Sequence, residues 1–154
     1  MRELRRKDRA MAQEAAQEVL NTAQYGILAT INEDGTPYGV PLSFVYRDQA
    51  IYFHSATTGQ KLDNIAWRDD TCFTVVTDTE VLPAAFSTKY KSVMVFGKVQ
   101  LVEDLAEKKQ AAIYFIEKYS RDFYQEGLVY IDKAIEQTKF FRLDITAMTG
   151  KAKI

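Results

Sequence analysis

The sequence contains a single cysteine and a single histidine among its 154 residues. Cys72 alone cannot form an intrachain disulfide, which excludes a disulfide-stapled fold. It also cannot supply the several thiolates of a structural zinc site, and His54 is the only imidazole that could assist it. We therefore expect no metal site, and a reducing, cytoplasmic location is the simplest one.

An excess of charge of either sign is also lacking. The chain carries 20 Lys and Arg against 21 Asp and Glu, a formal net charge of −1. This balance excludes the broad basic field of a nucleic-acid-binding protein, and the basic start over residues 2–9 is typical of a solvated chain end. No apolar run approaches the roughly 18 residues of a membrane span. We expect neither nucleic acid nor membrane as a partner.

Proline and glycine are scarce, with three and seven residues, so no flexible linker divides the chain. A length of 154 residues suits one domain, which we expect over residues 1–154. Hydrophobic periodicity and turn signals predict the elements. They are helices over 11–20, 62–67, 103–119 and 129–137, strands over 25–31, 37–46, 50–54, 71–77, 92–102 and 139–147, and a loop over 79–90.

Most of the expected strands follow one another directly, and the Asp34-Gly35 step favours a tight hairpin turn. This order predicts antiparallel pairing rather than β-α-β units. A sheet of about six such strands avoids exposed edges by curling into a small barrel. The sequence therefore predicts a mostly β, α+β fold, with helices packed outside an antiparallel barrel.

The expected second strand has one face of small residues. A period of two places Gly39, Pro41 and Ser43 opposite the apolar Val40 and Leu42. Proline cannot donate a hydrogen bond to a central ladder, so Pro41 predicts an edge strand or a bulge. The small face leaves room for a flat ligand against the backbone. A barrel corner that merely permits a bend is the alternative.

Residues 54–61 combine three hydroxyl side chains, a glycine and a lysine directly before the short helix. Backbone N–H groups at a helix start attract anions, and Lys61 would neutralise a phosphate held there. An ordinary capped loop with a solvated lysine is the alternative. His54 could contact a ligand, but no nucleophile or acid lies at a recognisable spacing from it. No catalytic residue is therefore assigned.

Several segments taken together resemble the pyridoxamine-phosphate-oxidase-like flavoproteins. Residues 27–30 and 32–42 resemble the opening of these proteins, and residues 51–56, 59–62 and 90–97 resemble their nitroimidazole-resistance-type branch. The order and spacing match over nearly the whole chain. The resemblance implies a split β-barrel that forms a homodimer, with two FMN molecules bound in clefts between the subunits.

The same resemblance implies a set of cofactor-binding residues. They are Val40, Pro41, Leu42 and Ser43 beside the flavin ring, His54, Ser55, Gln60 and Lys61 on the phosphate side, and Tyr90 and Ser92 reaching flavin from the partner subunit. The oxidases proper carry basic residues where this chain has Val40 and Val45, and they have a C-terminal substrate-binding segment that this chain lacks. Oxidation of vitamin B6 is therefore not expected.

The expected function is that of an FMN-binding flavoprotein, an oxidoreductase that reduces a small electrophile such as a nitroaromatic with NAD(P)H. Flavin carries the hydride in such chemistry, which explains why no catalytic triad is visible. Two other readings stay open. One is a non-catalytic module that binds flavin or haem for storage or sensing, with His54 as the one imidazole ligand. The other is an empty barrel that serves as a dimerisation scaffold.

Overall fold

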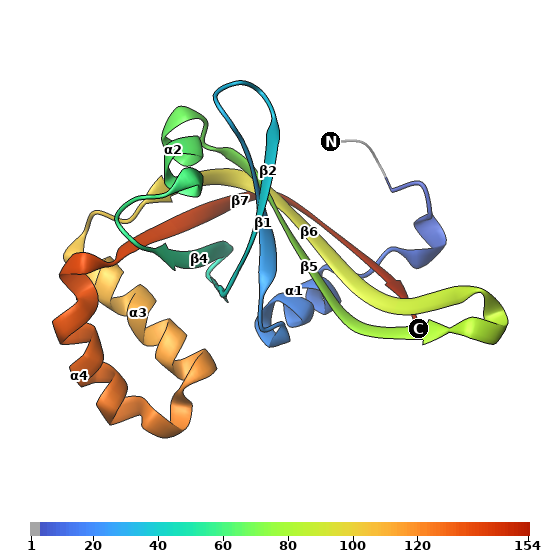
Figure 1. The fold of residues 1–154 in the computed structure, drawn as a ribbon. Helices are drawn as coiled ribbons and strands as arrows, with labels where there is room; N and C mark the ends of the chain where they lie inside the picture. Colours follow the sequence, from blue (N-terminus) through green and yellow to red (C-terminus); the bar gives the residue numbers. More distant parts are fainter. Residues whose placement is uncertain (1–3) are drawn as a thin grey trace.

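The computed structural model describes residues 4–154, so Arg2 of the basic start lies outside the described residues (Figure 1). Seven strands form one antiparallel sheet in the order β2-β1-β5-β6-β7-β4-β3. The strands are β1 (Gly26–Ile31), β2 (Pro37–Leu42), β3 (Val45–Arg47), β4 (Ala50–Ser55), β5 (Asp70–Leu82), β6 (Ser87–Leu101) and β7 (Lys139–Lys153). The helices are α1 (Gln13–Thr22), α2 (Gln60–Trp67), α3 (Leu105–Tyr119) and α4 (Tyr124–Ala134). No helix among residues 4–154 is long and apolar enough to cross a membrane.

The sheet is open, because its two edge strands, β2 and β3, do not pair with each other. These strands are neighbours in sequence, so the two edges of the sheet meet at the residues that join them. The predicted antiparallel α+β fold is confirmed, and the barrel is split at this corner. Pro41 lies in β2, which confirms the prediction of an edge strand.

The strands bury two separate hydrophobic clusters. Inside the curled sheet, Phe44, Phe53 and Phe73 are fully buried together with Leu20 of α1. A second cluster lies between the sheet and the α3–α4 pair, where Tyr52 of β4 contacts it from the strand side. Strand β4 is thus buried on both faces, which explains its continuous apolar run. This packing fixes β4 between the barrel interior and the two long helices.

The predicted single strand over 37–46 is wrong, because the chain breaks at Ser43 and Phe44. The backbone N–H of Phe44 donates to the Tyr119 hydroxyl at 3.0 Å, and Lys118 Nζ donates to the Phe44 carbonyl at 2.9 Å. Two α3 side chains therefore replace a neighbouring strand as partners of this backbone. The break turns one strand into two, which accounts for the seventh strand. It also places Val45 in the core, against the simple alternation.

The predicted loop over 79–90 is also wrong. Residues 80–82 of β5 pair with residues 87–89 of β6, and these two strand ends form a hairpin that extends away from the body (Figure 1). We call residues 78–91 the arm. Ion pairs between Lys91 and Asp78 (2.8 Å) and between Lys89 and Glu80 (3.5 Å) cross it. The polar composition of the segment suggested a loop, although the charges pair across two strands.

Candidate functional site

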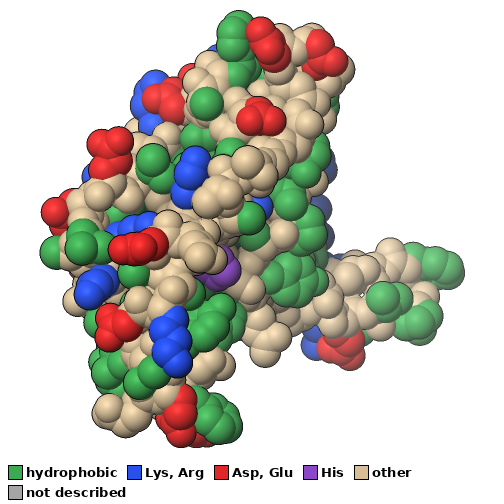
Figure 2. Space-filling model, turned by 60° about the vertical axis from the view of Figure 1, so that its left-hand side comes forward, with side chains coloured by type: hydrophobic (Ala, Val, Ile, Leu, Met, Phe, Trp, Pro, Cys, Tyr) green, Lys and Arg blue, Asp and Glu red, His purple; other side chains and the backbone are tan. Residues whose placement is uncertain are grey.

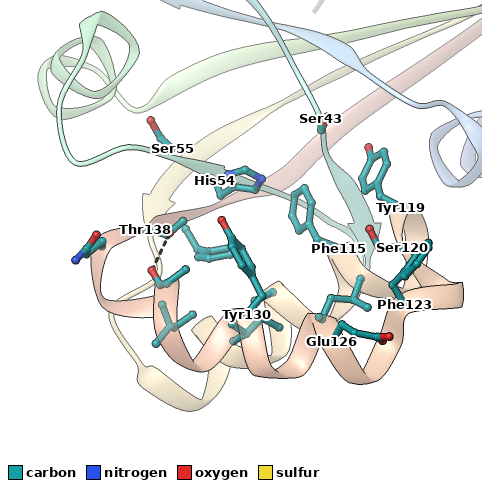
Figure 3. A pocket seen from close by; sticks show the side chains of 18 of the residues that line it. Ser43, His54, Ser55, Phe115, Tyr119, Ser120, Phe123, Glu126, Tyr130 and Thr138 are labelled. Atoms are coloured by element: carbon teal, nitrogen blue, oxygen red, sulfur yellow. Dashed lines mark hydrogen bonds between the residues drawn. The ribbon is translucent and has the colours of Figure 1, made fainter.

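A cavity of about 720 Å³ opens between β4, α3 and α4 (Figure 3). Strand β4 contributes His54 and Ser55, α3 contributes Phe115 and Tyr119, and α4 contributes Tyr130. Figure 2 shows the single histidine in a hollow of this face, with hydrophobic side chains beside it. The volume lies within the range of about 300–1,000 Å³ that is typical of small-molecule sites.

The imidazole of His54 packs against aromatic rings on one side and faces the cavity. Its centroid lies 4.8 Å from that of Phe115, in an edge-to-face arrangement, and 5.7 Å from that of Phe140. Partial burial among these groups lowers the pKa of His54, and the positive charge of Lys61 lowers it further. Both effects disfavour the imidazolium, so His54 is neutral at pH 7.

We expect the NMR titration of the only histidine in the chain to have its midpoint below pH 6.5. Replacing Lys61 with Met should move the midpoint upward, because one of the two causes is removed. Because the pKa of His54 is lowered in the folded protein, the unfolded state binds the proton more readily than the folded state. Protonation of His54 therefore makes the protein less stable as the pH falls below about 6.5. A midpoint above 6.5 would contradict the assigned environment.

Residues 55–61 form a segment with three unpaired groups that suit an anion. The Ser55 hydroxyl is buried, has no hydrogen-bond partner among residues 4–154, and points to the side of β4 opposite His54 (Figure 3). Gly59 precedes α2 with a φ of +140°, and no side chain caps this helix start. The structure shows no ion pair of Lys61 with a described residue. The segment therefore brings three groups within seven residues of sequence, which are the Ser55 hydroxyl, the uncapped N–H groups at the start of α2 and the Lys61 ammonium.

The side chain of Gln60 belongs to a network of amides beside this segment. Its Nε2 donates to Asn32 Oδ1 at 3.0 Å and to Asn64 Oδ1 at 3.1 Å. Asn64 is buried in α2 and donates to Thr30 Oγ1 at 3.0 Å and to Asn32 Oδ1 at 2.7 Å. The network fixes the start of α2 against the β1–β2 hairpin. Asn64 was missed in the sequence, although an asparagine beside buried Ile65 of a short helix is a usable signal.

The predicted flavin-side residues of β2 divide between the two faces of the sheet. Val40 and Leu42 pack against the barrel core, whereas Pro41 is exposed on the outer face. Ser43 lies at the corner after β2 and reaches the rim of the cavity (Figure 3). The backbone of β2 is therefore available to a ligand from outside, while two of the four predicted side chains point inward.

Tyr90 and Ser92 lie on β6 and do not line the cavity. Ser92 pairs with Lys151 of β7. The hydrogen-bonding Arg9 guanidinium lowers the pKa of Tyr90, and the charge of Lys151 adds to this effect. Within one chain the structure thus brings Ser43, His54 and Ser55 to one cavity and leaves Tyr90 and Ser92 on a different surface. Arg9 and Lys151 were not predicted, since only folding brings the two chain ends together.

The sequence profile of the pyridoxamine 5'-phosphate oxidase family matches residues 12–152. The chain belongs to the pyridoxamine 5'-phosphate oxidase family. This match confirms the resemblance of the segments described above.

Solved structures resemble this family member over most of its length. A putative 5-nitroimidazole antibiotic resistance protein from Bacteroides thetaiotaomicron is 25% identical, with a TM-score of 0.81 over 93% of this chain and 86% of that one. A conserved hypothetical protein from Mycobacterium tuberculosis is 18% identical, with a TM-score of 0.84 over 97% and 90%. A FAD-binding protein from Mesorhizobium loti is 24% identical, with a TM-score of 0.68 over 95% and 98%. No curated protein matches the sequence significantly.

Proposed function

We propose that this member of the pyridoxamine 5'-phosphate oxidase family binds FMN and uses it to reduce a small electrophile, such as a nitroaromatic, with NAD(P)H. The observation that carries the proposal is the segment 55–61, where a buried hydroxyl and a lysine, both without a partner in the part of the chain that the structure describes, lie close in sequence to an uncapped helix start. A phosphate monoester can accept hydrogen bonds from the hydroxyl and the N–H groups, and its charge suits the lysine. The similarity to the putative nitroimidazole resistance protein supports the choice of electrophile.

In this proposal each residue has a simple task. Ser55 and the first N–H groups of α2 donate hydrogen bonds to the phosphate, and Lys61 neutralises its charge. The outer face of β2 at Gly39 and Pro41 supports the flavin ring, because it presents little side-chain bulk. When bound, flavin supplies the hydride-transfer chemistry, so the chain has to bind and orient the reactants. This division of labour needs no catalytic triad.

We further propose that a second copy of the chain completes the site. Ile27, Val76 and Met94 of three adjacent strands are exposed on the sheet, and Phe86 at the tip of the arm is 97% exposed. The arm projects beyond the body, with hydrophobic side chains at its end (Figure 2). A homodimer would cover these side chains and bring Tyr90 and Ser92 toward the partner's flavin. Analytical ultracentrifugation should then give twice the chain mass of 17.6 kDa.

We expect FMN to raise the melting temperature of the purified protein and a flavin absorbance spectrum to accompany the bound form. A ligand that binds only the folded state adds about 2.7 kcal/mol at a hundred times its Kd. Oxidation of NAD(P)H that depends on an added nitro compound would then separate an enzyme from a carrier. No rise in melting temperature with FMN, together with no flavin in the spectrum, would refute the flavoprotein proposal.

Haem binding is the second candidate function, and the observation that favours it is His54. This imidazole is neutral at pH 7 and lies beside the Phe115 ring at the cavity, so it is the residue that would hold haem iron. The two candidates differ in their spectra. A Soret band that disappears in His54→Ala would favour haem, whereas a flavin spectrum that survives the same substitution would favour FMN.

A further inference from the structure

Of the residues that line the cavity between β4, α3 and α4, the proposed FMN site uses only Ser55, whose hydroxyl points to the other side of β4 (Figure 3). Its walls combine aliphatic side chains with five phenylalanine and tyrosine rings, and the rings of Phe115 and Tyr119 stack with centroids 5.8 Å apart. Two more aromatic side chains of the lining, Phe123 and Tyr130, are 64% and 71% exposed. Large aromatic surfaces that border a hollow, rather than pack in a core, favour a flat apolar ligand.

Two hydrogen-bonding groups face each other across this aromatic space. Tyr130 rises from α4 with its hydroxyl directed toward β4 and His54 (Figure 3). Within residues 4–154 the structure shows no hydrogen bond from either the Tyr130 hydroxyl or the His54 ring nitrogens. A neutral imidazole and a phenol each carry one proton to donate, so together they can hold an oxygen atom of a ligand.

The charges of the lining residues further restrict the class of ligand that the cavity can bind. Glu126 is its one charged residue among those described, and the carboxylate points away from His54 (Figure 3). The lining contains neither lysine nor arginine. An anionic ligand would lose its hydration without gaining an opposite charge there, which is unfavourable. An uncharged ring loses little hydration free energy when it enters the cavity.

We infer that this cavity binds a planar, uncharged ring compound that carries a hydrogen-bond-accepting oxygen. The ring lies among Phe115, Phe123 and Tyr119, and the oxygen accepts a hydrogen bond from the Tyr130 hydroxyl beside His54. Tyr130 is thereby a substrate-binding residue, which the sequence did not indicate. The inference that this ligand is the substrate rests on the proposed function, in which the compound bound here is the one that is reduced.

The test uses isothermal titration of the full chain with three probes of similar size, which are coumarin, naphthalene and coumarin-3-carboxylate. Coumarin should bind best, because naphthalene lacks the oxygen and the carboxylate adds a charge. Tyr130→Phe keeps the ring and removes the hydroxyl, so it should weaken coumarin about five- to tenfold and leave naphthalene unchanged. Tyr25→Phe alters a tyrosine that is 63% exposed and outside the cavity, and it should change neither affinity.

Two results would overturn the inference. One is an equal loss of affinity for coumarin and naphthalene in Tyr130→Phe, since the hydroxyl would then have no part in recognition. The other is the absence of coumarin binding to the unaltered chain, both with and without FMN. FMN binding is followed separately through flavin absorbance. Coumarin binding without FMN binding would refute the proposed function alone, and FMN binding without coumarin binding would refute the cavity assignment alone.

Discussion

Gly97→Ala is expected to lower the free energy of unfolding by about 3 kcal/mol or more. A Cβ atom at this position would lie 2.0 Å from the carbonyl oxygen of Asp144 and 2.9 Å from its carbonyl carbon. Both atoms belong to the backbone of β7, which pairs with β6 on both sides of this point and cannot withdraw cheaply. In a domain of this size each kcal/mol lowers the melting temperature by about 2–4 °C, so thermal unfolding would show the loss clearly.

Gly39→Ala is the matched control for this prediction. A Cβ atom there would meet only the Ile27 Cγ2 atom, at 3.5 Å, which is an ordinary van der Waals contact. Both substitutions reduce the conformational freedom of the unfolded chain by the same amount, so their difference isolates the clash. We expect the control to change stability by less than about 0.5 kcal/mol. Equal melting temperatures for the two variants would show that β7 yields at Gly97.

Gly97 marks the limit of what the sequence predicts about the fold. It lies where the register between β6 and β7 shifts, opposite Ile145. Local features were readable, such as the turn at Gly35, which has a φ of +84°, and the inward side chains Ile51 and Phe53. Those features depend on neighbours within a few residues. The register shift depends on two strands that lie far apart in sequence, and no local pattern encodes it.

The break between β2 and β3 has the same cause. The Phe44 backbone ends its strand because Tyr119, 75 residues later, hydrogen-bonds to it. The Tyr119 hydroxyl also lies 2.6 Å from the carbonyl oxygen of Gln24 and 2.8 Å from that of Phe44, so its one proton can be donated to either of them. Alternation along residues 37–46 is compatible with one long strand, and only the packing of α3 against this corner decides otherwise. A tertiary contact here overrides a local preference.

The candidate site likewise has one part that depends on local sequence and another that depends on tertiary packing. The segment proposed to bind the phosphate could be singled out in the sequence because a helix start with hydroxyls and a lysine is a local feature, and Ser55 and Lys61 lie six residues apart. The cavity was not predicted, since it exists only after α4 folds against β4 and brings Tyr130 opposite His54. Gln60 shows a third case. It lies at the start of α2, within the segment, and its amide is held by Asn32 and Asn64.

Lys61→Ala is expected to weaken FMN binding by about ten- to a hundredfold and to change riboflavin binding less than twofold. FMN and riboflavin share the same ring and side chain and differ in the phosphate, so the contrast isolates the charge that Lys61 neutralises. Stability should stay the same, since Lys61 makes no ion pair with the described residues. Quenching of flavin fluorescence on binding measures both affinities. Lys133→Ala, which alters an exposed lysine on α4, is the matched control.

Ser55→Ala distinguishes the charge of Lys61 from the hydrogen bonds of the same segment. It removes a buried hydroxyl that has no partner among residues 4–154, so the free protein should become no less stable. Its effect on FMN binding should be smaller than that of Lys61→Ala, because a neutral donor contributes less than a charged one.

Equal losses of affinity for FMN and riboflavin in Lys61→Ala would place the phosphate elsewhere. The buried Ser55 hydroxyl would then need another partner, and a second copy of the chain would be the next one to test.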